Sequence, residues 1–305
     1  MRNSFINRLC ALARKDNRIC LVVGDLGFSI VEPFAKEFPD RFLNAGVAEQ
    51  NMIGLAAGWS IAINKIVFVY SIANFPTFRC LEQIRNDVCY HKANVKIVSV
   101  GGGLTYGSAG FSHHAIEDFA IMRALPGMVI AAPADAYETD LIVNLAVKTA
   151  GPFYIRLGKN NEPAVQKHHY SLNIGDPISY IDRSDILIFS IGTLISEVIN
   201  AAKIFNRKGT KVSVMGIPFL KPLNPEKILQ VLKNKKMIIT IEEHSCFGGL
   251  GTAIGEIMAA NNISIPFRTL CLPEFITCVG NQKDLRNFYG IDAASIEKYL
   301  SEVLE

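Results

Sequence analysis

The sequence predicts an α/β protein made of two doubly wound domains. Short apolar runs rich in branched residues alternate with segments of helical periodicity, and the apolar runs lack the polar alternation of half-exposed strands. This order is typical of parallel sheets that helices cover on both faces. The chain has 305 residues, half of them apolar, and at about 150 residues per domain this length favours two domains.

The first domain is predicted at residues 1–165. Four apolar runs are expected to be its buried strands, and four amphipathic segments its helices. The expected strands are Ile19–Gly24, Ile66–Tyr70, Val95–Val100 and Met128–Ala132. The expected helices are Ser4–Lys15, Ala48–Ile63, Phe78–His91 and Ala136–Lys148, and a short strand at Phe42–Leu43 precedes the second of them.

A polar stretch at residues 159–176, which includes Asn160, Asn161, His168 and His169, predicts a linker. A second alternating set follows, in a smaller α/β domain predicted at residues 175–305. Its expected strands are Ile186–Ile191, Val212–Gly216 and Met237–Ile241. Its expected helices are Leu194–Asn206, Pro225–Leu232 and one that runs from Gly248-Gly249-Leu250-Gly251 to Ala260.

The charge and hydropathy patterns disfavour a nucleic acid or a membrane as partner. The 31 basic and 28 acidic residues leave a net charge of +3 that is dispersed along the chain. The apolar run Met52–Ile63 is shorter than the roughly 20 residues that a bilayer requires. Arg8, Arg14 and Lys15 interrupt what would be the apolar part of a signal peptide. We therefore expect a soluble, cytoplasmic protein.

The seven cysteines do not predict a disulfide framework or a structural zinc site. Their number is odd and no two have C-x-x-C spacing. Several lie among apolar residues, as Cys20 does in Ile19–Val22. Buried reduced thiols are the expectation.

Two glycine-rich turns invite a phosphate-binding interpretation that their spacing does not support. Neither Gly101-Gly102-Gly103 nor Gly248-Gly249-Leu250-Gly251 completes G-x-G-x-x-G, and no P-loop lysine follows them. Tight turns after strands are the expected structure. The chain therefore shows no convincing phosphate cradle.

Glu49 is the most informative charged residue. It lies at the start of a predicted helix that is apolar nearly all round, so its carboxylate is expected to be buried in a first helical turn. The helix dipole favours a carboxylate there, but burial removes its water, so it needs a dedicated partner. Glu49 could also cap the helix or pair with a buried arginine, and the pattern alone leaves these alternatives open.

Motifs spread along the chain in a fixed order carry a family resemblance. They are Pro39-Asp40-Arg41-Phe42, Gly46 with Ala48-Glu49-Gln50-Asn51-Met52, Glu82-Gln83-Ile84-Arg85, Gly110 to Asp118, Pro126 to Ile130, Pro133-Ala134-Asp135, Lys221-Pro222-Leu223, Glu242-Glu243-His244 and Gly248 to Gly251. They resemble the pyrimidine-binding and C-terminal domains of transketolases and deoxyxylulose-phosphate synthases. The chain looks like the separately encoded C-terminal half of a split transketolase.

The resemblance implies thiamine diphosphate as the cofactor and Glu49 as the catalytic glutamate, which would hydrogen-bond the aminopyrimidine ring nitrogen. Such a bond favours the tautomer that can remove the proton from the thiazolium carbon, and an apolar surrounding keeps water from this exchange. The implied reaction moves a two-carbon ketol unit from a ketose, or a ketose phosphate, to an aldehyde acceptor.

The resemblance also assigns further site residues. Phe75 and Phe78 fall near positions where aromatic rings stack on the pyrimidine, although core packing is an alternative for both. His113 matches a histidine that faces the reacting carbons, and His114 beside it is a second substrate-binding candidate. Lys159 stands where many relatives hold a phosphate-binding arginine, and a solvated linker lysine is the alternative.

Departures from the family pattern point to an unusual donor and to a partner. Ala109 replaces an aspartate that contacts the donor hydroxyl, and Ile72 replaces a phenylalanine. The G-D-G motif and downstream asparagine that bind the diphosphate and Mg²⁺ are missing, since Gly24-Asp25-Leu26-Gly27 sits at a different point, where Asp25 suits a strand-end turn.

The resemblance thus implies an N-terminal transketolase subunit that supplies the diphosphate and Mg²⁺ ligands, with no metal ligand in this chain. The expected assembly is a heterotetramer in which this chain also contacts its own copy. The beta subunit of a 2-oxo acid dehydrogenase and a non-catalytic binding subunit are the alternatives. The Ala48-Glu49-Gln50 and His113 motifs favour a transketolase over the first, and retention of Glu49 argues against the second.

Overall fold

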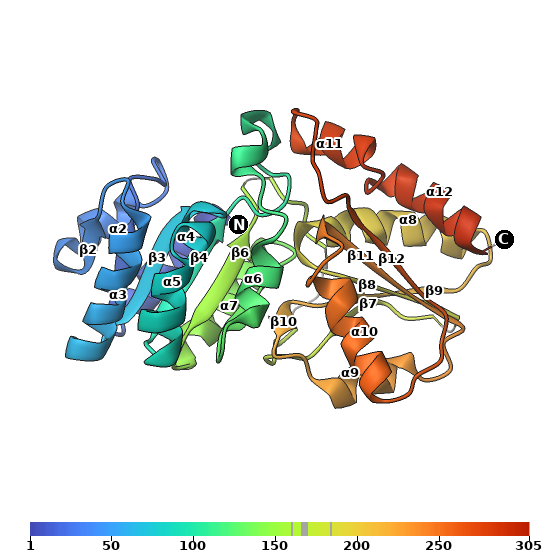
Figure 1. Cartoon of the computed structure of the whole chain (residues 1–305), viewed down its shortest axis with the longest axis horizontal. Coiled ribbons are helices and arrows are strands. Elements are labelled where there is room, and N and C mark those ends of the chain that lie inside the picture. Colours follow the sequence, from blue (N-terminus) through green and yellow to red (C-terminus); the bar gives the residue numbers. More distant parts are fainter. Residues whose placement is uncertain (160, 166–169, 184, 305) are drawn as a thin grey trace.

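The computed structural model describes residues 1–159, 161–165, 170–183 and 185–304. The chain is built on two sheets that lie side by side, with helices over them (Figure 1). We call the part on the seven-stranded sheet the first lobe (residues 1–159) and the part on the five-stranded sheet the second lobe (residues 178–304). Asn160, His168 and His169 of the predicted linker lie outside the described residues.

The sheet of the first lobe has the strand order β10-β5-β6-β4-β3-β1-β2. All its neighbours are parallel except β10, which is antiparallel to β5 and comes from the chain of the second lobe. The strands are β1 Ile19–Val23, β2 Phe42–Asn44, β3 Ile66–Ile72, β4 Val95–Val100, β5 Val129–Ala131, β6 Phe153–Leu157 and β10 Phe219–Lys221. The four expected strands and the short one at Phe42–Leu43 are present, whereas β6 and β10 were not predicted.

Helices cover both faces of this sheet, as the continuous apolar strands required. Along β1, Cys20 and Val22 pack on one face with α3, while Leu21 and Val23 pack on the other with α1. The helices of this lobe are α1 Arg2–Ala13, α2 Glu32–Glu37, α3 Glu49–Ile63, α4 Phe75–Phe78, α5 Leu81–Gln83, α6 Asp118–Ala124 and α7 Ala136–Lys148, with short 3-10 turns η1 Pro39–Arg41, η3 Gly107–Ala109 and η4 Phe111–His113.

The second lobe has the strand order β12-β11-β8-β9-β7, parallel except for β7. The strands are β7 Ile178–Ile181, β8 Ile186–Ser190, β9 Val212–Gly216, β11 Met237–Ser245 and β12 Phe267–Leu272. The helices are α8 Ile195–Arg207, α9 Pro225–Leu232, α10 Leu250–Ala260, α11 Gln282–Phe288 and α12 Ala293–Leu304, with the 3-10 turn η5 Gly192–Leu194. The expected strands and helices are present, and β7, β12, α11 and α12 were not predicted.

The prediction of one helix at Phe78–His91 is wrong. The segment instead begins at the last residue of α4 and continues with a break at Arg79 and Cys80, then α5, and a π-helix η2 at Ile84–Tyr90. The buried residues Ile84, Val88 and Cys89 keep the segment on the core, and this produced the helical periodicity. The break places the side chain of Arg79 at the edge of the sheet, where it contacts Glu49.

The prediction that the cysteines are reduced is wrong for one pair. Cys246 and Cys271 form a disulfide with their Cα atoms 5.5 Å apart. They meet because β11 and β12 are parallel neighbours, with Ser245 paired to Leu272, which spacing along the sequence does not reveal. Four free cysteines are buried, as expected: Cys10, Cys20, Cys80 and Cys89.

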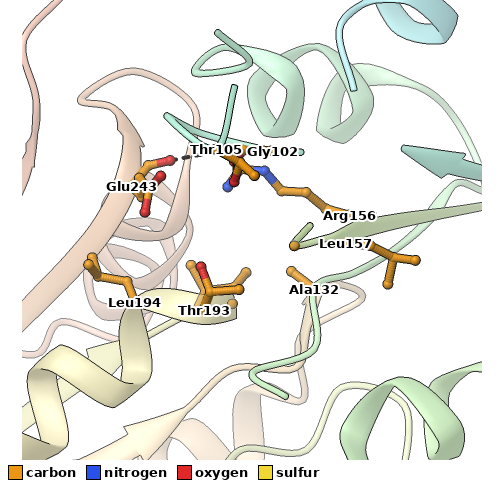
Figure 2. A pocket seen from close by; sticks show the side chains of 11 residues that line it. Gly102, Thr105, Ala132, Arg156, Leu157, Thr193, Leu194 and Glu243 are labelled. Atoms are coloured by element: carbon orange, nitrogen blue, oxygen red, sulfur yellow. Dashed lines mark hydrogen bonds between the residues drawn. The ribbon is translucent and has the colours of Figure 1, made fainter. Parts of the chain in front are cut away.

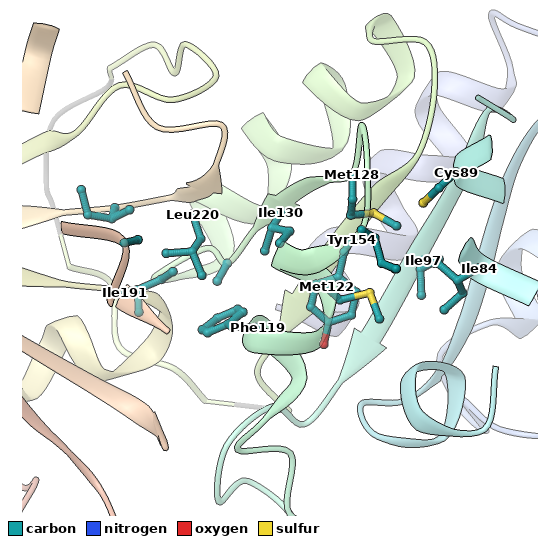
Figure 3. Packing of buried hydrophobic residues seen from close by; sticks show 14 of the residues in the cluster. Ile84, Cys89, Ile97, Phe119, Met122, Met128, Ile130, Tyr154, Ile191 and Leu220 are labelled. Carbon is teal, nitrogen blue, oxygen red and sulfur yellow. The ribbon is translucent and has the colours of Figure 1, made fainter. Parts of the chain in front are cut away.

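The core of the first lobe continues into the second. The same buried cluster that contains Ile97 and Met128 also contains Ile191 and Leu220 of the second lobe (Figure 3). Phe119 of α6 lies between these groups in Figure 3. This shared core fixes the position of one lobe on the other. No helix of the described part of the chain is long and apolar enough to cross a membrane.

Candidate cofactor and substrate site

Glu49 is the first residue of α3 and follows a turn in which Gly46 has φ +73°. Its side chain is 3% exposed. Oε2 accepts a hydrogen bond from Arg79 Nη1 at 3.0 Å. Oε1 is buried and has no hydrogen-bond partner within the described residues. A buried acceptor without a partner costs free energy, so this carboxylate is suited to receive a donor from elsewhere.

The surroundings of Glu49 distinguish between helix capping and pairing with an arginine. The N-cap of α3 is Ala48, and no side chain caps the helix, so capping does not explain Glu49. It does pair with an arginine, but Arg79 is about half exposed, at 49%, rather than buried. The ion pair therefore joins a buried carboxylate to a half-exposed guanidinium.

Arg79 also lies over an aromatic ring. Its guanidinium carbon is 4.2 Å from the ring centroid of Phe75 in α4. Its backbone carbonyl accepts a hydrogen bond from Gln50 Nε2 at 2.9 Å, which joins the α4–α5 break to the start of α3. Phe75 itself is half-buried. The flat face predicted for a pyrimidine is thus present, and Arg79 lies on it.

Four of the predicted site residues form one continuous row with two residues that the sequence analysis missed. From Phe75 the row continues to His113, whose ring centroid is 5.2 Å away and edge-on. Tyr106 follows, 6.3 Å from His113, and Lys159 Nζ lies 4.8 Å from the Tyr106 ring centroid. With Glu49 and Arg79 at the other end, the row joins a carboxylate, two cations and a histidine along the carboxyl ends of the strands.

Arg79 and Tyr106 were the missed members of this row. Arg79 is the only charged residue from Ala73 to Leu81, and this isolation was a usable signal. Tyr106 had no such signal, because its place depends on the fold of the loop after β4. Arg2 is a third missed neighbour: its Nε donates to the Lys159 carbonyl at 2.7 Å, so two cationic side chains lie near this end of the row.

The other two predicted residues lie beside the row. Phe78 is exposed and lines a mainly apolar pocket with Phe111. His114 lines the same pocket but is only 2% exposed, and its Nε2 lies 3.3 Å from the Gly107 carbonyl. Burial lowers the pKa of His114, so its neutral form is favoured. Neither residue contacts Glu49 in the described structure.

The loop that carries Tyr106 and His113 is held by the second lobe. Glu243 Oε1 accepts from the Leu104 amide at 2.7 Å, and the Ser245 amide donates to the Ile116 carbonyl at 2.8 Å. Arg156 Nη2 bridges the lobes by donating to the carbonyls of Ala115 and Glu243. In Figure 2, Arg156 and Gly102 of the first lobe face Glu243 and Thr193 of the second across a narrow cavity.

Behind this loop lies a buried cluster of charged and aromatic side chains. Asp118 Oδ2 accepts from the Tyr154 hydroxyl at 2.5 Å and lies 3.1 Å from Arg156 Nε. Arg156 Cζ lies 4.2 Å over the ring of Phe119, and His244 stacks on the same phenylalanine at 5.3 Å. Burial lowers the pKa of His244 to about 4. All five side chains of this cluster are buried.

Glu242 has a structural task as well. Its two carboxylate oxygens accept from the amides of Leu250 and Gly251 at 2.7 and 2.8 Å, so it satisfies the start of α10. A side chain at Gly249 would meet Glu242 Oε2 at 2.1 Å. The glycine-rich turn is therefore explained by this close approach.

At the end of β1, Asp25 has φ +56° and its Oδ1 accepts from Asn44 Nδ2 at 3.0 Å. This fits the strand-end turn expected for it. Within the described residues, no three histidine, cysteine or acidic side chains gather so that they could hold a metal ion.

Comparison with known families gives the class. A model of the transketolase pyrimidine-binding domain matches residues 1–164, and a model of the transketolase C-terminal domain matches residues 181–296. The two models together define a protein of the transketolase class, a family that implies thiamine diphosphate as cofactor. The chain belongs to the transketolase family, as the sequence motifs predicted.

Relatives of the same length narrow the position within the family. The chain is 35% identical to one subunit of an apulose-4-phosphate transketolase of Phocaeicola vulgatus, over 100% of this chain and 97% of that one. It is 30% identical to a 6-deoxy-6-sulfo-D-fructose transketolase subunit of Clostridium sp., over 100% and 94%. By contrast, it spans 46% of a deoxyxylulose-phosphate synthase of Heliobacterium modesticaldum. The chain is thus a transketolase subunit, and the 2-oxo acid dehydrogenase alternative is not favoured.

Solved structures agree with this position. A split-gene transketolase, described as an inactive beta4 tetramer, superposes with a TM-score of 0.87 at 34% identity, over 99% of this chain and 96% of that one. The transketolase of Campylobacter jejuni superposes with a TM-score of 0.82 at 15% identity, over 99% of this chain and 46% of that one. The second likeness shows the fold alone.

Proposed function

We propose that this chain binds the pyrimidine half of thiamine diphosphate and completes the active site of a two-subunit transketolase. The family implies this cofactor. The observation that carries the proposal is Glu49, a buried carboxylate with Oε1 free of partners within the described residues, near the aromatic ring of Phe75. An aminopyrimidine needs one hydrogen-bonding carboxylate and one flat apolar face, and these residues fit both needs.

In this proposal each residue of the row has a separate task. When bound, the cofactor supplies the nucleophilic carbon on which ketol transfer depends. Glu49 Oε1 holds the hydrogen bond at the pyrimidine ring nitrogen, and the apolar wall of α3 excludes water from it. Phe75 orients the ring by stacking, and Phe78 and Phe111 line the neighbouring apolar pocket.

His113 is the proposed proton-relaying residue. Its Nδ1 lies 3.0 Å from Ser112 Oγ, so Nε2 is the nitrogen that remains to hold a substrate oxygen or its proton. The edge-on contact with Phe75 orients the imidazole. His114 is a weaker proposal for substrate binding, because its ring is buried and faces the Gly107 carbonyl.

Lys159 is proposed to bind an anionic group at the far end of the sugar, with Arg2 close by. The exposed Lys159 stands one ring beyond His113 in the row, so a donor that reaches from the cofactor past His113 would end there. Two of the relatives described above are named for apulose 4-phosphate and for a sulfonated ketose, and both names describe an anionic sugar. We therefore propose a ketose that carries a phosphate or a sulfonate as the donor.

The missing half of the site is proposed to come from an N-terminal subunit that holds the diphosphate and Mg²⁺. We propose a heterotetramer in which this chain also contacts its own copy, with a role in carbohydrate metabolism in the cytoplasm. The division into a pyrimidine-binding domain at residues 1–165 and a C-terminal domain at residues 175–305 belongs to the same proposal.

The test is reconstitution with the N-terminal subunit encoded by the adjacent reading frame. Ketol transfer to an aldehyde would be measured with thiamine diphosphate and Mg²⁺, from a ketose phosphate, a ketose sulfonate and an uncharged ketose. We expect Glu49→Gln to lower the rate by about 10²–10⁴-fold, because loss of a positioned acid–base group has effects of this size.

Glu37→Gln is the matched control, since Glu37 is a surface carboxylate that also pairs with an arginine, Arg14, and lies on α2 away from the row. It should leave the rate unchanged. A reconstituted wild type that neither binds the cofactor nor turns over any of the ketoses contradicts the proposal, and so does full activity of Glu49→Gln.

A further inference from the structure

Arg79 contacts two groups that the proposed cofactor would also contact, the Glu49 carboxylate and the Phe75 ring. Its guanidinium donates to Glu49 at 3.0 Å and lies over the Phe75 ring at 4.2 Å. A guanidinium is flat and cationic, so it satisfies a carboxylate and an aromatic face together. A pyrimidine that stacks on Phe75 needs the same ring, and it would hydrogen-bond the other oxygen of the same carboxylate, Oε1.

Arg79 covers one face of the Phe75 ring, with its guanidinium carbon 4.2 Å from the ring centroid. His113 also contacts the Phe75 ring, at a centroid distance of 5.2 Å and an interplanar angle of 65°, so it is not stacked on it. The 4.2 Å between the Arg79 guanidinium carbon and the Phe75 ring centroid leaves no space for another flat group between them. A second flat group can therefore take this face only after the guanidinium has left it.

We propose that Arg79 is a displaceable counter-ion, which holds the place of the pyrimidine in the cofactor-free chain and swings out when thiamine diphosphate binds. This inference rests on the proposed function. It explains why a carboxylate that is 3% exposed can remain in a chain without cofactor, because an unpaired buried charge is strongly unfavourable. It also gives Arg79 a task that no sequence motif assigned to it.

The local structure allows this movement. Arg79 lies at the break between α4 and α5, and its side chain is 49% exposed, so its guanidinium can turn into solvent. The backbone can stay in place, because its carbonyl is held by Gln50 Nε2. Arg79 borders both the apolar pocket that contains Phe75 and Phe78 and the pocket that contains Glu49 and Gln50. Its departure would join them.

The effect of removing Arg79 on the Kd for thiamine diphosphate has opposite signs if Arg79 leaves on binding and if it stays. If Arg79 must leave, the free energy of its contacts opposes cofactor binding, so removing it should tighten binding and destabilise the cofactor-free chain. If Arg79 stays beside Glu49 in the bound state, removing it should weaken binding. The direction of the change in Kd therefore decides between them.

The experiment compares Arg79→Met with wild type by calorimetric titration of thiamine diphosphate, in Mg²⁺, into the reconstituted two-subunit complex. We expect Kd to fall by about three- to tenfold, since a half-exposed ion pair and one cation–π contact together have this size. In parallel, the thermal midpoint of the full chain without cofactor should fall for Arg79→Met. Arg79→Lys keeps the charge but loses the flat stack, so its Kd should lie between the two.

Arg18→Met is the matched control. Arg18 is 50% exposed and pairs with Asp16 at 2.7 Å, but it lies at the amino end of β1, away from the row. Its removal should leave Kd unchanged. An unchanged or raised Kd for both Arg79 variants overturns the inference while leaving the proposed function intact. A wild-type complex that binds no thiamine diphosphate overturns the proposed function and this inference with it.

Discussion

The chain builds the same set of side chains twice, once at the open row and once in the buried cluster. In the row, Arg79 lies 4.2 Å over Phe75 and 3.0 Å from Glu49, with His113 beside the phenylalanine. In the cluster, Arg156 lies 4.2 Å over Phe119 and 3.1 Å from Asp118, with His244 beside the phenylalanine. The residue types and the distances are nearly the same.

Exposure and additional partners separate the two sets. Arg156 is 8% exposed and donates to two further carbonyls from opposite lobes, whereas Arg79 is 49% exposed and its guanidinium reaches one carboxylate. A buried pair with bridging hydrogen bonds stabilises one arrangement, because breaking it leaves a charge without water. A half-exposed pair can exchange partners at low cost. The first set thus serves stability and the second is available for chemistry.

The largest effect is expected for a substitution that breaks the buried set of side chains. Asp118→Ala should lower the free energy of unfolding by about 3–5 kcal/mol, because it leaves Arg156 buried without its carboxylate. Urea unfolding of the full chain would measure this loss. Glu256→Ala is the control, since it breaks an arginine pair whose carboxylate is 60% exposed, and it should cost at most about 1 kcal/mol. Equal losses of unfolding free energy for the two variants would show that burial does not determine how much an arginine–carboxylate pair stabilises the chain.

A smaller effect concerns pH and His244. Burial lowers its folded pKa to about 4, whereas an unfolded histidine titrates near about 6.5. Between these values the unfolded chain binds a proton that the folded chain does not, so stability falls as pH falls from about 6.5 to about 4. In His244→Asn, the fall in unfolding free energy across this pH window should be smaller by about 1–3 kcal/mol.

The measurement is the free energy of unfolding of wild type and His244→Asn at several pH values across that window. Burial raises the pKa of Glu242 to about 7, which gives a slope of opposite sign; because Glu242 Oε2 lies 3.9 Å from His244 Nδ1, the double variant with Glu242→Gln separates the two contributions. Parallel pH curves for the two proteins would contradict the assignment of the slope to His244.

The smallest expected effect sharpens the comparison between the two phenylalanines. Phe75→Leu should weaken thiamine diphosphate binding by about two- to tenfold, since the flat face is lost, and leave stability nearly unchanged. Phe119→Leu should lower stability by about 1 kcal/mol, since a fully buried ring is replaced, and leave binding unchanged. Calorimetric titration of the complex and urea unfolding of the full chain measure the two effects. If Phe75→Leu lowered stability and Phe119→Leu weakened binding, the distinction between row and cluster would be wrong.

Much of this molecule could be predicted from local patterns. The buried strands were visible because parallel strands covered on both faces are continuously apolar, as Val95–Val100 is. Glu49 stood out because a carboxylate at the start of the apolar helix α3 is rare and costly. The family motifs then connected Glu49 to Phe75, His113 and Lys159, which the structure brings into one row.

What failed depends on contacts between distant parts of the chain. The Phe78–His91 helix was predicted because its buried residues have helical spacing, whereas the break at Arg79 accompanies a contact with Glu49, 30 residues away. Cys246 and Cys271 meet through the pairing of β11 with β12. Strand β10 pairs with β5 in the first sheet, although its residues lie among those of the second lobe in the sequence.

The sequence by itself determined the class of fold, the family and the identity of the buried carboxylate, because apolar periodicity and motif order are properties of neighbours along the chain. Only the tertiary structure decided which of two similar sets of arginine, phenylalanine, histidine and carboxylate is open and which is closed. Burial of a charge is set by what packs over it from elsewhere. The second lobe packs over Arg156, whereas nothing in the described chain covers Arg79 to the same extent.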